Sequence, residues 1–101
     1  MTRKALVERN KKRQDMYLRL HDKRDALKAI IKDLELSIED RLDAQIKLQA
    51  MPRDSSKIRH LNRCINCNRP KGVYQYFGLC RCCLRKFFSK GYIPGLRKSS
   101  W

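Results

Sequence analysis

The chain has 101 residues, a formal net charge of +15 and a sequence pI near 10.1, with 8% aromatic and 35% charged residues. One small domain with an extension is the limit at this length, and this composition excludes a single large core. The sequence also predicts neither a membrane-spanning helix, which needs roughly 20 apolar residues, nor a signal or transit peptide.

The positive charge is concentrated in the second half of the chain. Residues 1–51 hold 13 Lys and Arg against 9 Asp and Glu, whereas residues 52–101 hold 12 against one acid, Asp54. An excess of that size indicates binding to a polyanion with a phosphate backbone rather than to a small acidic substrate.

The first 51 residues are predicted to form a helical extension, with two helices closing as an antiparallel hairpin. Residues 3–34 contain no Gly or Pro, and a first apolar stripe on that helix consists of Leu27, Ile30, Ile31 and Leu34. A second helix is expected over residues 38–50, capped by Ser37 and ended by Pro52. Its own apolar stripe consists of Ile38, Leu42 and Ile46. The hairpin is expected to bury both stripes and to depend on a partner for its order, because so few aliphatic side chains barely offset the chain entropy.

Residues 52–63 show no helical or strand period and are predicted to be a basic, extended linker. The remaining residues, 64–101, are predicted to form a metal-binding and polyanion-binding module with a C-terminal tail. An extended stretch is expected over residues 73–77, and a short helix is expected from near Cys80 to Gly91. Leu84, Phe87 and Phe88 are expected to pack that helix on the metal loop.

Four cysteines in two Cys-x-x-Cys pairs, Cys64 with Cys67 and Cys80 with Cys83, predict one structural zinc ion. Four sulfur ligands leave no open position for a catalytic water. Buried reduced thiols and a redox dithiol are the alternatives, and no βαβ pattern supports the second. Cys82 is expected to be a small hydrophobe outside the ligand set, although its place between Cys80 and Cys83 leaves the fourth ligand open to test. The fold class is therefore a small, α-rich, metal-stabilised protein with a zinc knuckle.

No group of residues has the composition of a catalytic site, so an enzyme is not expected. Arg side chains grip phosphate in a bidentate manner, and aromatic rings can stack on unpaired bases. The side chains predicted to contact RNA are Arg53, Lys57, Arg59, Arg63, Arg69, Lys71, Arg81, Arg85, Lys86, Arg97, Lys98 and Trp101.

Several motifs in a fixed order resemble one family, the universal small-subunit ribosomal protein S-fourteen. They are residues 48–56 (LQAMPRDSS), 62–64 (NRC), 68–70 (NRP), 77–79 (FGL) and 93–101 (IPGLRKSSW). The resemblance implies a structural constituent of the small ribosomal subunit that binds the 3′ major domain of its rRNA in the head and helps assembly. It also implies the third, tenth and nineteenth small-subunit proteins as neighbours, and neither a membrane nor a second copy of the chain as partner.

The chain resembles the long form of that family in its N-terminal helices and the zinc form in its cysteines. This mixture leaves a bacterium and a mitochondrion open as sources, with a slight lean to the mitochondrion. Two other functions are weighed: a free-standing zinc-ribbon regulator that binds nucleic acid, and a small redox or metal-carrier protein. Weak self-packing of the helices argues against the first, and the concentrated positive charge argues against the second.

Overall fold

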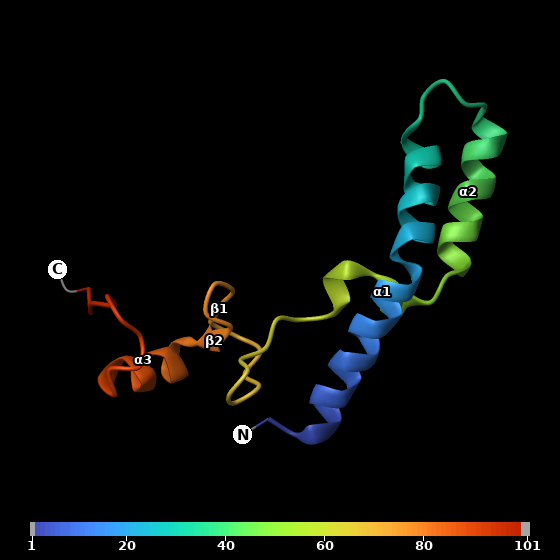
Figure 1. The fold of residues 1–101 in the computed structure, drawn as a ribbon. Helices are drawn as coiled ribbons and strands as arrows, with labels where there is room; N and C mark the ends of the chain where they lie inside the picture. Colours follow the sequence, from blue (N-terminus) through green and yellow to red (C-terminus); the bar gives the residue numbers. More distant parts are fainter. Residues whose placement is uncertain (1, 100–101) are drawn as a thin grey trace. The chain divides into compact units, whose positions relative to one another are not determined.

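A computed structural model describes residues 2–99, which contain three α-helices, two 3₁₀ turns and one two-stranded sheet (Figure 1). In chain order these are α1 (Lys4–Lys32), α2 (Ile38–Ala50), η1 (Arg53–Ser55), η2 (Lys57–Arg59), β1 (Val73–Tyr74), β2 (Leu79–Cys80) and α3 (Arg81–Ser89). The chain divides into two compact units. The helical unit is Glu8–His60, and the knuckle unit combines the residues up to Val7 with those from Leu61 on.

Within the helical unit, α1 and α2 form the antiparallel hairpin that the sequence predicts (Figure 1). The predicted bounds of α2 are confirmed, and so is its N-cap: the Ser37 side chain accepts a hydrogen bond from the backbone N–H of Asp40. Glu39 and Asp40 place negative charge in the first turn, where the helix dipole favours it. The guanidinium of Arg41 donates to the carbonyl oxygen of Ile31 at 3.1 Å and so fastens the closed end of the hairpin.

The expectation that the hairpin buries both apolar stripes is wrong for α2. Ile38, Leu42 and Ile46, which we call the α2 apolar stripe, are 73%, 52% and 63% exposed. The buried residue of α2 is instead Ala44, at 4%. At 3.6 residues per turn Leu42 lies about 160° round the helix from Ala44, so the two cannot face the same neighbour. The methyl side chain of Ala44 also allows α2 to approach its neighbour more closely than the larger side chains of the α2 apolar stripe would.

The first α1 stripe is likewise only partly covered. Leu27 and Ile31 are half-buried, whereas Ile30 is 38% and Leu34 is 81% exposed. The half-buried face of α1 continues toward its N-terminus through Tyr17, Leu20 and Arg24, at helical spacing. This face of α1 therefore packs against residues 52–60 as well as against α2.

The prediction of an extended segment over residues 52–63 is wrong for its first part, which forms η1 and η2 and packs within the helical unit. Ser55 is fully buried; its hydroxyl accepts a 3.0 Å hydrogen bond from the guanidinium of Arg24 and donates to the carbonyl oxygen of Pro52. The ring of His60 lies 5.1 Å from that of Tyr17, centroid to centroid. Polar and aromatic contacts, which no apolar period reveals, therefore order this segment.

The knuckle unit is built from two short loops and α3. β1 and β2 pair antiparallel, with Val73 opposite Cys80 and Tyr74 opposite Leu79. The expected extended stretch thus covers only Val73–Tyr74, because residues 75–78 form a tight turn. Gly78 has φ +66° and donates its N–H to the carbonyl oxygen of Tyr74 at 2.8 Å, which closes that turn. The hydroxyl of Thr2 donates to the carbonyl oxygen of Asn68 at 3.0 Å and ties the start of the chain to the same unit.

Candidate metal centre and polyanion-binding surface

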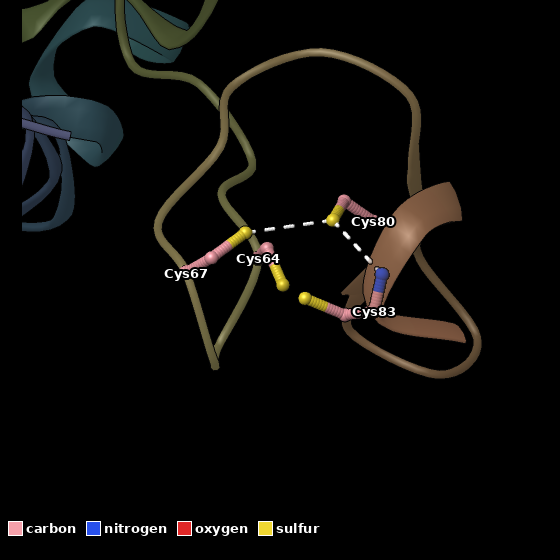
Figure 2. A group of neighbouring side chains, drawn as sticks. All are labelled: Cys64, Cys67, Cys80 and Cys83. Atoms are coloured by element: carbon pink, nitrogen blue, oxygen red, sulfur yellow. Dashed lines mark hydrogen bonds between the residues drawn. The ribbon is translucent and has the colours of Figure 1, made fainter. Parts of the chain in front are cut away.

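The four predicted ligands converge at the centre of the knuckle unit. The sulfurs of Cys64, Cys67, Cys80 and Cys83 all lie within 4.8 Å of one another, and those of Cys67 and Cys80 are 3.5 Å apart (Figure 2). Cys64 and Cys80 are fully buried and Cys83 is 4% exposed. Among residues 2–99, these thiols form the core of the knuckle unit, and Val73, Leu79 and Phe87 pack around them.

Local backbone bonds place each cysteine pair. In the first loop the N–H of Asn68 donates to the carbonyl oxygen of Cys64 at 2.9 Å, and Asn68 takes the left-handed conformation with φ 58°. In the second, Cys80 is the N-cap of α3 and its sulfur accepts from the N–H of Cys83. The N–H of Ile65 donates to the carbonyl oxygen of Gly78 at 2.9 Å and joins the two loops. The folded backbone therefore sets the distances between the sulfurs.

The thiols differ in how readily they ionise. Burial opposes ionisation of Cys64, but backbone N–H groups directed at its sulfur, first that of Cys67, lower its pKa to about 6. Cys83 shows the opposite. The amide of Asn66 donates to its sulfur, yet burial and the three neighbouring thiols raise its pKa to about 12. Four sulfurs this close cannot all carry charge without a cation among them.

The donor set fits zinc. Zinc binds thiolate at about 2.3 Å, and a tetrahedron of such bonds separates neighbouring sulfurs by about 3.8 Å. The spacing of these sulfurs brackets that value. Cys82 lies outside the cluster: it is exposed, and its sulfur accepts from the guanidinium of Arg69 at 3.2 Å. No motif in the sequence singles out Asn66, whose amide contacts the Cys83 sulfur; its position inside the first Cys-x-x-Cys turn is the one sequence signal for that contact.

The cations predicted to bind RNA fall into three groups. Arg59 and Arg63 have protein partners: Arg59 lies 3.4 Å from the carboxylate of Asp54, and Arg63 donates to the carbonyl oxygen of Asn68 at 2.9 Å. Arg69 contacts Cys82, as described. The others are exposed on the surface of their own unit, and they are Arg53, Lys57, Lys71, Arg81, Arg85, Lys86, Arg97 and Lys98. Trp101 lies outside the described residues.

The described helices include none that is long and apolar enough to cross a membrane. From Leu61 onward the chain holds nine Lys and Arg and no acid. A cysteine-centred knuckle with this uncompensated charge, joined to a helical extension, is typical of small metal-stabilised proteins that bind polyanions.

Comparison with known proteins identifies the family within that class. The family model described as ribosomal protein S14p/S29e matches residues 47–100. The chain is 54% identical over all 101 residues to the small ribosomal subunit protein uS14 of Ehrlichia canis, and both chains are covered completely. The uS14 proteins of Anaplasma phagocytophilum and Xanthomonas campestris are 54% and 48% identical, again over the full length of both chains. The chain belongs to the uS14 family of small-ribosomal-subunit proteins.

Family membership confirms the resemblance seen in the motifs. The protein is a structural constituent of the small ribosomal subunit and acts in translation; it is not an enzyme. The relatives named above are bacterial proteins, which supports a ribosome of the bacterial cytoplasm, and the lean toward a mitochondrial source finds no support.

Proposed function

We propose that this protein binds small-subunit rRNA in the head of the subunit, in the 3′ major domain, and helps that region to assemble. One observation carries the proposal: nine cations and no acid lie between Leu61 and the end of the chain. Such a surface attracts a polyanion, and in a small-subunit constituent the available polyanion is rRNA. Trp101 would add burial or stacking to the contacts of the cations.

Zinc held by Cys64, Cys67, Cys80 and Cys83 would supply the rigidity of the RNA-binding surface. Within residues 2–99 no aliphatic side chain of the knuckle is fully buried, so its loops depend on the sulfur cluster. When bound, the ion cross-links the two loops and neutralises the thiolates. The chain's own residues then fix the direction of the cations that flank the cluster, Arg69 and Lys71 in the first loop and Arg81 on α3.

Ribosomal proteins are the second class of partner, and the α2 apolar stripe supports this. It is bordered by Glu39 and Asp43 on one edge, and the cation on its other edge, Arg41, is bonded to the carbonyl oxygen of Ile31. This charge pattern suits a protein surface better than RNA. We propose the third, tenth and nineteenth small-subunit proteins as neighbours in the head. Binding there would order the hairpin and leave no face for self-association. A free-standing zinc-ribbon regulator is not favoured, since the full-length relatives are ribosomal proteins.

The test is a titration of an rRNA fragment from the head domain at several salt concentrations. Each phosphate contact contributes roughly −0.7 to −0.9 to the slope of log affinity against log salt. We expect a slope of about −5, made shallower by about one unit in Lys71→Gln or Lys86→Gln. A slope near zero would contradict the RNA proposal. An equal slope on duplex DNA of matched length would favour the regulator instead.

A further inference from the structure

Helix α3 presents two different faces within the knuckle unit. Cys83 and Phe87 lie on the face toward the sulfur cluster. Arg81, Leu84, Arg85 and Phe88 recur at i, i+3, i+4 and i+7 and so share another face. Within residues 2–99 Phe87 packs against the sulfur cluster as the sequence suggested, whereas Leu84 and Phe88 are not among the side chains packed there. They are the floor of a separate hollow.

The hollow has a volume of about 230 Å³ and three walls. One is the face of α3 just described. The second is Tyr74 on β1, whose side chain is 52% exposed. The third is the C-terminal tail from Leu96 to Ser99, which turns back after Gly91 and Gly95, both at positive φ. This volume is below that of a typical pocket for a drug-sized ligand, so it suits one flat ring with its substituents.

The charge on the rim is one-sided. Arg81, Arg85, Arg97 and Lys98 line the hollow, and no acid does. Within residues 2–99 none of these four forms an ion pair with a carboxylate. The ammonium of Lys98 lies 5.5 Å from the centre of the Phe88 ring and covers that ring in part. Tyr74 is the other aromatic residue that lines the hollow, and it is half exposed.

We propose that this hollow binds one unpaired nucleotide of RNA, with its base against Tyr74 and the apolar floor and its phosphates on the arginine rim. The proposal rests on the proposed rRNA binding and adds which RNA feature is recognised. A duplex backbone would satisfy the cations but would leave Tyr74, Leu84 and Leu96 facing water. An unstacked nucleotide satisfies both parts, because the guanidinium forks grip its phosphates and its base stacks on the phenol ring.

The experiment uses the full-length, zinc-loaded chain and two probes. One is a short, fully paired RNA duplex; the other is the same duplex with a single unpaired 2-aminopurine. We expect tighter binding of the bulged duplex, with 2-aminopurine fluorescence quenched on binding. Tyr74→Leu should reduce that preference by about fivefold to a hundredfold, the range of base–aromatic stacking. Tyr74→Phe should keep it.

Matched controls separate the hollow from general RNA binding. Tyr76→Leu removes a neighbouring tyrosine that is 93% exposed and outside the hollow, and it should leave the preference unchanged. Arg85→Gln should weaken binding of the bulged duplex more than Lys86→Gln does. If Tyr74→Leu loses zinc, this second pair of variants tests the nucleotide site instead. Equal binding of both duplexes would overturn the proposed nucleotide site but not the rRNA proposal. Equal effects of Tyr74→Leu and Tyr76→Leu, or of Arg85→Gln and Lys86→Gln, would do the same. No binding to either duplex would overturn the rRNA proposal as well.

Discussion

The helical unit and the knuckle unit reach order by different means, although neither shows a conventional apolar core in residues 2–99. Among these residues the buried side chains of the knuckle are Cys64, Cys80 and Cys83. In the helical unit they are Ala44 and Ser55, and the contacts around them are largely hydrogen bonds and ring contacts. The comparison teaches that a chain this basic does not rely on aliphatic burial: one unit is organised around four converging sulfurs, and the other around hydrogen bonds and ring contacts.

The largest expected effect is loss of the metal from the knuckle. Structural zinc contributes about 10–16 kcal/mol in small units of this type, more than any other contact available here. Cys67→Ser should remove about one zinc per chain and melt the knuckle, as measured by elemental analysis and amide NMR. Cys82→Ser is the matched control and should keep the zinc, because its sulfur lies outside the cluster. A Cys67→Ser protein that stays folded, or parent subunits without zinc, would contradict the expectation that the knuckle depends on a metal.

Hydrogen exchange of the free chain should show different amide protection in the helical unit and in the knuckle unit. We expect weak protection over residues 26–46, because the α2 apolar stripe is exposed and little else holds the hairpin. The amides of Ile65 and Arg81, which are bonded across the knuckle, should be protected when zinc is bound. Assembly into the subunit should then protect residues 26–46. Strong protection there in the free chain at low concentration would instead reveal an autonomous helical domain.

A smaller effect is expected from Ser55→Ala in the helical unit. This change leaves the half-buried guanidinium of Arg24 without its acceptor, at a cost of about 1–3 kcal/mol. Because the hairpin must be ordered for assembly, affinity for subunits depleted of the protein should fall about fivefold to a hundredfold. Zinc content should not change. Ser56→Ala, at a neighbouring half-buried serine without a side-chain cap bond, is the control and should have little effect.

The smallest effect is expected from Gly78→Ala in the knuckle. A side chain at φ +66° costs about 1–2 kcal/mol, and a Cβ there would lie 2.6 Å from the Cδ1 atom of Ile65. Ile65 is exposed and can move aside, so the backbone cost should dominate. Zinc affinity should fall about fivefold to thirtyfold. Gly91→Ala shares the positive φ but lies outside the sulfur loops with open space around it, so zinc affinity should not respond.

The sequence predicted those elements whose signals are local. Ser37, followed by two acids, specified the start of α2, and the cysteine spacing specified the four sulfurs that converge. It failed where the outcome depends on a neighbour. A periodic stripe shows that Ile38, Leu42 and Ile46 share a face but not whether anything covers that face. The burial of Ser55 by Arg24 joins residues 31 positions apart, and no local pattern encodes it.

The division of the chain also sets an order of events during synthesis. The helical unit is continuous from Glu8 to His60, so all its segments have been made before Cys64 is added. The knuckle can close only once Cys83 is available, 23 residues after His60. At roughly 5–20 residues per second this interval lasts about 1–5 s. The residues of the α2 apolar stripe are therefore complete in the nascent chain some seconds before all four cysteines that would hold a metal are present.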